Sequence, residues 1–432
     1  MEFEPVLIVA VLIVMYSVVS RRLNDLSITG PFVFVAAGIL LGRGGFGVLG
    51  GEFDQGAIEV LAEITLVLLL FTDATRIDLR ALRSQIQLPA RLLSVGLPLT
   101  VALGAGIAWL LLPGVSLWEA GLVGAVLAPT DAALGQAVVS DPRVPVRVRQ
   151  ALNVESGLND GLMLPAITVI LALAATEIDL ETPGFWALFA VKQIGYGVAS
   201  GAVLGAIGGR LLDHTVARGW VEGTFRQLAT LSIGISAFSM AEVLGGNGFV
   251  AAFTAGIAFG FVARHECETA ADFAEDEGQL FALVTFLFFG ATLAGPALSD
   301  LTWQIGLYAV LSLTVTRMLP VALSLVALGL ERRTIAFIGW FGPRGLASIL
   351  FGISVLGQAE LPNGPTIITV VTWTVLGSVV LHGLSSVPLT VRYAAWFGSM
   401  RDTAGMPEGV AVDAMRLRVQ GGNKVTQRGQ VA

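Results

Sequence analysis

The sequence predicts an all-α polytopic membrane protein with about 13 transmembrane helices, arranged as inverted six-helix repeats with two broken helices that cross at mid-membrane. Three observations support this fold class. The 432 residues are 55% hydrophobic and only 13% charged, whereas soluble domains carry about 25% charged residues. Apolar runs of spanning length recur along the chain. Two of these runs carry Pro and Gly at mid-depth, at positions seven spans apart.

Each expected span is an apolar run of roughly 17–25 residues, the length that crosses a bilayer. The first run, MEFEPVLIVAVLIVMYSVVS, has neither a basic segment before it nor a small-residue cleavage site, so it is expected to remain as a helix. The thirteen runs lie near 5–20, 28–42, 57–74, 91–112, 119–138, 151–174, 185–210, 222–244, 247–263, 278–295, 301–327, 334–357 and 365–389. Residues 1–399 are therefore assigned to a transmembrane domain, and residues 400–432 to a short, polar, mobile cytosolic tail.

The loop arginines predict the orientation of the chain. They follow the odd-numbered spans, and the intervening loops carry almost none, with Arg43 as the exception. They are Arg21, Arg22, Arg76, Arg80, Arg83, Arg143, Arg147, Arg149, Arg218, Arg264, Arg332, Arg333, Arg392 and Arg401. Because basic loops stay in the cytoplasm, the N-terminus is expected outside the cell membrane and the tail inside.

Spans five and twelve contain the sequences LAPTDAALG and WFGPRGLAS. Pro removes a hydrogen bond from a helix and Gly weakens it, so both segments are expected to unwind locally. Unwound backbone at membrane depth persists only where it lines a cavity in the protein. Two six-helix units joined by a linking helix would separate the breaks by seven spans and invert the second unit, and paired broken helices are typical of secondary transporters.

Carboxyl groups gather around the first break and at the start of span six, in NVESGLNDG. An ionisable residue inside a span costs about 2.5–3.5 kcal/mol on insertion scales, which indicates a functional role. Asp160 is the strongest candidate, and Ser156 lies one turn before it on the same helix face. A hard alkali cation prefers oxygen ligands. We therefore predict a site for transported Na⁺ and H⁺ formed by Asp160, Asp131, Thr130 and Ser156, completed by carbonyls of the broken span.

A single buried carboxylate can hold a proton or a cation but not both well, and this competition produces exchange without a second site. Structural alternatives remain open for each residue. Asp160 could cap a helix or pair with an arginine, and Asp131 could cap a broken helix. Thr130 and Ser156 could instead hydrogen-bond to helix carbonyls.

Glu155 and Arg344 are predicted to form an ion pair between spans six and twelve. Removing one member of a buried pair leaves the other uncompensated, at roughly 3–5 kcal/mol. Arg344 stays charged and is not the proton carrier, although it could bind an anionic substrate. Other polar residues in the spans are expected to bond to backbone at helix breaks or to pair with one another: Glu63, Asp73, Lys192, Glu242 and Arg317. No ion role is assigned to Asp73.

Composition excludes several other kinds of site. The one cysteine, Cys267, cannot form an internal disulfide, and His214, His265 and His382 are too scattered for a metal cluster. No phosphate-binding loop is present, so the energy for transport is expected from an ion gradient.

Four motifs, APTDAALG, NVESGLNDG, GGNGFVAAFTAG and GPRGLAS, occur in an order that resembles the monovalent cation:proton antiporters of the sodium/proton-exchanger (NhaP-like) branch. The resemblance covers residues 5–390. It implies a homodimer in which a core domain moves against dimerisation helices. It also implies that Asn159, before the essential acid, goes with electroneutral one-for-one exchange. The implied ion site is Thr130, Asp131, Ser156 and Asp160, and the implied structural ion pair is Glu155 with Arg344.

The predicted function is therefore secondary active antiport of a monovalent cation for H⁺ by alternating access, with Na⁺ favoured over K⁺ or Li⁺ and a role in pH homeostasis. Two alternatives are a cation channel lined by the same acids and an organic-anion symporter that uses Arg344. The clustered acids and the single pair of breaks favour antiport. The chain is not expected to be an enzyme, to hold a cofactor or to bind nucleic acid. Its expected partners are the transported cation and proton, the lipid bilayer and a second copy of the chain.

Overall fold

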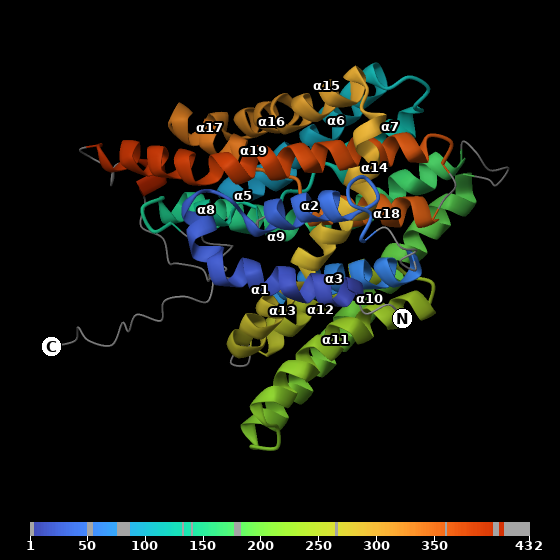
Figure 1. Ribbon diagram of the computed structural model, residues 1–432. Coiled ribbons are helices and arrows are strands. Elements are labelled where there is room, and N and C mark those ends of the chain that lie inside the picture. The colour runs from blue at the N-terminus through green and yellow to red at the C-terminus, as the bar shows by residue number, and fades with distance from the viewer. Residues whose placement is uncertain are drawn as a thin grey trace.

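The computed structural model describes residues 4–49, 55–75, 87–131, 134–139, 141–176, 183–263, 267–358, 361–400 and 406–409. All regular secondary structure in these ranges is helical (Figure 1). Each of the thirteen expected spans corresponds to one helix or to consecutive helices, which confirms the all-α fold class. Some residues used for the orientation lie outside the described ranges, namely Arg76, Arg80, Arg83, Arg264 and Arg401.

The first half of the chain forms the first six spans. The helices are α1 (Glu4–Asp25), α2 (Gly30–Leu41), α3 (Gln55–Thr75), α5 (Gln87–Arg91), α6 (Leu97–Leu111), α7 (Leu117–Val126), α8 (Gln136–Val139) and α9 (Val146–Thr176). A π-helical turn, Leu92–Gly96, joins α5 to α6 in one span. α7 is only 10 residues long because it stops at the predicted first break.

The second half begins with α10 (Pro183–Ala217), the linking helix of the sequence prediction. It is followed by α11 (Gly223–Val243), α12 (Gly248–Val262), α13 (Cys267–Phe288), α14 (Gly295–Ala297), α15 (Trp303–Leu313), α16 (Val315–Leu325), α17 (Arg332–Trp340), α18 (Leu346–Gln358) and α19 (Gly364–Gly398). Among the described residues, 7 helices or continuous helical runs are long and apolar enough to cross a membrane, and α2, α7 and α12 are shorter apolar helices.

Glu119 fixes the start of α7 and ties it to the start of α19. Ser116 and Glu119 form a capping box, in which Oε2 of Glu119 accepts a 2.9 Å hydrogen bond from the N–H of Ser116. The same carboxylate accepts hydrogen bonds from the N–H and the side-chain Nδ2 of Asn363, at 2.9 and 2.8 Å. Two segments almost 250 residues apart therefore share one buried cap.

The motif GGNGFVAAFTAG brings α12 close to its neighbours, as its small residues predict. A Cβ at Gly201 of α10 would lie 3.0 Å from the carbonyl carbon of Ala251. A Cβ at Gly256 would lie 2.7 Å from Cβ of Ala74 on α3. Glu242 caps the start of α12 by accepting a 2.7 Å hydrogen bond from the N–H of Gly248, which confirms the expected backbone role for this acid.

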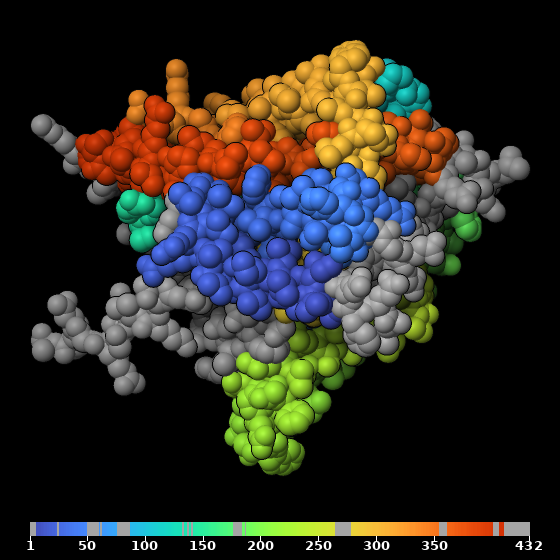
Figure 2. Space-filling view, viewed as in Figure 1, coloured from blue at the N-terminus to red at the C-terminus, as the bar shows by residue number. Residues whose placement is uncertain are grey.

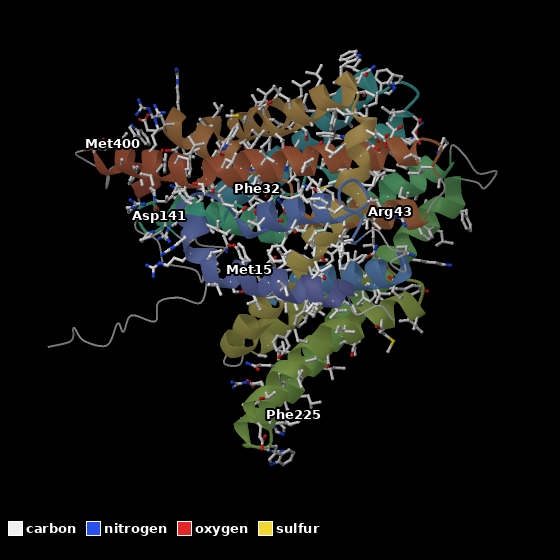
Figure 3. The ribbon with its side chains drawn as sticks, viewed as in Figure 1. Met15, Phe32, Arg43, Asp141, Phe225 and Met400 are labelled. Carbon is white, nitrogen blue, oxygen red and sulfur yellow. The ribbon has the colours of Figure 1, made fainter. Side chains whose placement is uncertain are left out.

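Apolar side chains cover the outer surface. α1 lies on the face nearest the viewer in Figure 2, and no residue in its spanning window is buried inside the chain. Met15 of α1 and Phe225 of α11, both labelled in Figure 3, are each 63% exposed. The tip formed by α10 and α11 projects away from the rest of the molecule (Figure 1). Such surfaces are expected for helices that face lipid or a second subunit.

Part of the tail contacts the helices, whereas the sequence predicts a mobile segment. Pro407–Gly409 forms one helical turn, and the carbonyl oxygen of Pro407 accepts a 2.6 Å hydrogen bond from Nη1 of Arg147 on α9. Glu408 is buried and accepts a 2.6 Å hydrogen bond from the N–H of Glu331, just before α17. Residues 401–405 and 410–432 lie outside the described ranges, so the prediction is not tested there.

Candidate functional site

The two broken helices cross at their interruptions. α7 ends at Val126 and α17 ends at Trp340, and each is followed by a non-helical segment. The N–H of Asp131 in the first segment donates a 2.8 Å hydrogen bond to the carbonyl oxygen of Pro343 in the second. The structure therefore confirms both predicted interruptions and places them in direct contact.

Each interruption is capped by a charged side chain from the other. Nη1 of Arg344 donates to the carbonyl oxygens of Ala128 and Pro129, at 2.7 and 3.1 Å. Oδ2 of Asp131 accepts a 3.1 Å hydrogen bond from the N–H of Leu346, the first residue of α18. A cation at the carbonyl end of one helix and an anion at the N–H end of the other both match the helix dipoles. Asp131 thus makes the helix-capping contact that is the structural alternative for this residue.

The glycines of the motif GPRG leave room for charged side chains. A Cβ at Gly342 would lie 2.8 Å from Cδ of Arg317, and a Cβ at Gly345 would lie 2.6 Å from Cγ of Asp131. Real Cβ atoms do not approach neighbours this closely, so either substitution forces the charged group to move. Packing therefore requires glycine at both positions. This requirement is separate from the tendency of glycine to weaken a helix.

Thr130, Ser156 and Asn159 form a hydrogen-bonded polar cluster beside the first break. The hydroxyls of Thr130 and Ser156 lie 3.0 Å apart. Nδ2 of Asn159 donates a 2.7 Å hydrogen bond to Oγ1 of Thr130. All three side chains are buried, and Oδ1 of Asn159 accepts no hydrogen bond from the described residues. The cluster therefore concentrates neutral oxygen atoms at the point where α7 unwinds.

Asp160 adds a carboxylate to this region. It lies on the continuous helix α9, one turn after Ser156, so the two side chains share a helix face as the sequence predicts. Asp160 is partly buried. No group of three or more His, Cys, Asp or Glu side chains suited to a metal ion occurs in the described part of the chain.

Glu155 pairs with Arg317, which corrects the predicted pair of Glu155 with Arg344. Nη1 and Nη2 of Arg317 donate to Oε1 and Oε2 of Glu155, at 2.5 and 2.8 Å. Both side chains are almost fully buried, at 4% and 3% exposed. The reason for the difference is that the freed carbonyls of the first break occupy the guanidinium of Arg344. Arg317, on α16, is left to neutralise Glu155.

Arg317 and Asp73 lie near the site, although their sequence context predicts no site role for either of them. Both were visible as charged residues inside apolar runs, and that was the only signal available. Asp73 of α3 is the nearest side chain to Gly157 of α9, because a Cβ at Gly157 would lie 4.0 Å from its Cβ. Asp73 therefore faces the helix that carries Ser156 and Asp160.

Comparison with known proteins identifies the family. Residues 7–392 match the family model described as "Sodium/hydrogen exchanger, transmembrane". This chain belongs to the sodium/hydrogen exchanger family. It is 26% identical over 382 residues to the K(+)/H(+) antiporter NhaP2 of Shewanella sp. (strain ANA-3). This alignment covers 88% of this chain and 64% of that protein. It is 24% identical over 349 residues to the Na(+)/H(+) antiporter of Schizosaccharomyces pombe, which covers 72% of this chain and 74% of that protein.

The fold of this exchanger-family chain is shared with a solved structure. The sodium proton antiporter MjNhaP1 from Methanocaldococcus jannaschii at pH 8 superposes with a TM-score of 0.71 and 22% sequence identity, covering 90% of this chain and 98% of that one. Together with the family match, the helical spans make the chain a multi-pass integral membrane protein. It spans about 64% of the length of the NhaP2 relatives that it matches.

Proposed function

We propose that the chain exchanges a monovalent cation for protons by alternating access, with Na⁺ as the first candidate and K⁺ and Li⁺ as alternatives. The observation that carries the proposal is the position of Asp160 one turn after Ser156, whose hydroxyl contacts Thr130 at the unwound end of α7. Two relatives are named as antiporters, one for K⁺ and one for Na⁺, which supports cation exchange without selecting the cation.

Charge balance explains why such a site would exchange its ligands. An empty carboxylate in a low-dielectric region is costly, whereas a protonated carboxyl and a carboxylate with a bound monovalent cation both have no net charge. The core can therefore move the site from one side of the membrane to the other when the site holds a proton or a cation, but not easily when the site is empty. One carboxylate alternates between one proton and one cation, so the exchange is one for one and electroneutral. Asn159 donates to Thr130 and adds no second titrating acid.

The other residues of the site have two separate roles: some would bind the cation, and others hold the helices in place. The hydroxyls of Thr130 and Ser156 and the carbonyls near the break replace water around the cation. Asp131 holds the start of α18, and Arg344 holds the end of the first half-helix, so the break keeps its shape without water. The pair of Glu155 with Arg317 joins α9 to α16 beside the site.

The proposal extends to the assembly and placement of the chain. The outward apolar side chains of α1 support a homodimer in which the core moves against dimerisation helices. The loop arginines support an N-terminus outside the cell membrane and a cytoplasmic tail. In the cell the exchanger would contribute to pH homeostasis.

The deciding experiment is proton flux in proteoliposomes that contain the full chain, measured with an internal pH-sensitive dye. Na⁺, K⁺ and Li⁺ are added in turn, with the membrane potential either clamped or free. We expect cation-driven proton movement that clamping leaves unchanged. Asp160→Asn is expected to reduce it at least 100-fold while the variant keeps its thermal unfolding temperature in detergent, because the amide neither binds a proton nor neutralises a cation.

Other outcomes would select the alternatives. Single-channel currents in a planar bilayer would indicate a channel. Uptake of an organic anion that survives Asp160→Asn but not the loss of Arg344 would indicate an anion symporter. Normal exchange by Asp160→Asn would contradict the assignment of this residue.

A further inference from the structure

The last helix of the domain passes both edges of the second break. His382 and Ser378, one turn apart on α19, are 1% and 0% exposed. Nε2 of His382 lies 3.0 Å from the carbonyl oxygen of Trp340, the last residue of α17. Oγ of Ser378 accepts a 2.7 Å hydrogen bond from the N–H of Arg344, two residues before α18 begins. His382 thus contacts one edge of the break, and Ser378 contacts the other.

The two side chains also contact each other, because Nδ1 of His382 lies 3.1 Å from Oγ of Ser378. The four groups therefore form a continuous relay from the Trp340 carbonyl, through His382 and Ser378, to the Arg344 backbone. The relay spans the non-helical segment without involving any of the predicted cation ligands.

The positions of the hydrogens follow from what each group can donate. The backbone N–H of Arg344 can only donate, so Ser378 Oγ is its acceptor and the hydroxyl hydrogen is free to point elsewhere. That hydrogen can go to Nδ1 of His382 only if Nδ1 carries none. Nε2 then carries the ring hydrogen and donates it to the Trp340 carbonyl, which also accepts a 2.9 Å hydrogen bond from Gly342.

The other protonation forms fit this arrangement less well. With hydrogen on Nδ1 alone, the ring could donate to the Ser378 carbonyl oxygen at 3.2 Å, but an Nε2 lone pair would face the Trp340 oxygen. An imidazolium would remove the acceptor of the Ser378 hydroxyl. It would also add a positive charge near Arg344 and Arg317, two arginines that are already buried in this part of the core. The neutral form with hydrogen on Nε2 is the one that satisfies every group in the relay.

We propose that His382, in its neutral Nε2–H form, is a positioning residue for cation exchange, acting with Ser378 to hold the two edges of the second break at a fixed separation. The proposal rests on the exchange function proposed above. By fixing the Arg344 backbone, the relay keeps the Arg344 guanidinium on the carbonyls of the first break. It likewise keeps the Leu346 N–H on the carboxylate of Asp131. His382 touches no transported ion and acts only through these residues.

Substitutions of His382 separate this role from simple core packing. His382→Gln can place an N–H where Nε2 lies and so keeps the bond to Trp340, whereas His382→Asn keeps a group near Nδ1 and loses that bond. We expect exchange turnover in proteoliposomes to fall at least tenfold in His382→Ala and His382→Asn. We expect His382→Gln to retain at least a third of the wild-type turnover. The exposed His214 of α10 provides the matched control, because His214→Ala is expected to leave turnover unchanged.

Nitrogen NMR of the wild-type full chain with labelled histidine tests the same inference without any loss of folding. The signal of His382 is assigned by its disappearance in His382→Gln, and it is expected to show hydrogen on Nε2 only. A neutral Nδ1–H form or an imidazolium signal would overturn the proposal. So would a His382→Gln variant as inactive as His382→Ala, or full turnover in His382→Ala. If the wild-type chain exchanges no cation at all, the proposed function fails, while the NMR spectrum still decides whether the relay exists.

Discussion

At the scale of single residues, each of the two buried arginines of the core has a partner of its own. Arg317 neutralises Glu155, and Arg344 occupies the carbonyls that the first break sets free. The two arginines are therefore not interchangeable, although both are buried basic residues of the second half of the chain. A bidentate guanidinium–carboxylate contact is also a geometry that lysine cannot reproduce.

Breaking the pair of Glu155 and Arg317 should be strongly destabilising. We expect Arg317→Ala to lower the free energy of unfolding by roughly 3–5 kcal/mol, because a buried carboxylate loses its compensating charge. Thermal unfolding of the purified protein in detergent measures the effect. The exchanged pair Glu155→Arg with Arg317→Glu should recover part of the loss. Recovery by exchanging Glu155 with Arg344 instead would contradict the observed pairing.

At the scale of the elements, the two half-helices depend on each other. Arg344 binds the carbonyls of Ala128 and Pro129, just after the end of α7, and Asp131 binds the first N–H of α18. The glycines of the second break leave room for charged side chains, since Gly342 faces Arg317 and Gly345 faces Asp131. A change of one methyl group at the crossing is therefore expected to affect both broken helices at once.

Gly342→Ala tests the packing of the second break against Arg317. Its new Cβ would lie 2.8 Å from Cδ of Arg317, so the guanidinium must shift away from Glu155. We expect a loss of about 1–3 kcal/mol in stability, as for other overpacked sites, together with reduced exchange. Gly106→Ala on α6 is the control, since nothing lies within 4 Å of a Cβ there. Equal unfolding temperatures for the two variants would count against the packing argument.

At the scale of the whole molecule, hydrogen bonds join helices from the two halves of the chain at both ends. Glu119 joins the start of α7 to the start of α19. At the opposite end of the molecule, where α8 and α17 lie in Figure 1, the turn at Pro407–Gly409 contacts Arg147 of α9 and the residue before α17. The helices that carry the site are thereby held to one another outside the crossing itself.

The contact made by Glu408 predicts a measurable role for part of the tail. Glu408→Ala removes the acceptor of the Glu331 N–H and is expected to cost about 1–3 kcal/mol of stability in the thermal unfolding assay. Glu222→Ala is the matched control, because Glu222 is exposed at the start of α11 and its side chain makes no capping hydrogen bond. If Glu408→Ala unfolds at the wild-type temperature, the tail turn does not stabilise the domain.

The sequence alone was sufficient for the fold class, the positions of the helices and the two breaks. These features are local, because apolar runs of a given length form spans and Pro and Gly interrupt them. Tertiary structure decided which arginine meets Glu155, which N–H Asp131 caps, and what His382 and Glu408 contact. These choices depend on distances between helices more than 30 residues apart in the chain, such as the 162 positions between Glu155 and Arg317. Burial requires each polar group to find a partner, but only the packed helices determine which partner is within reach.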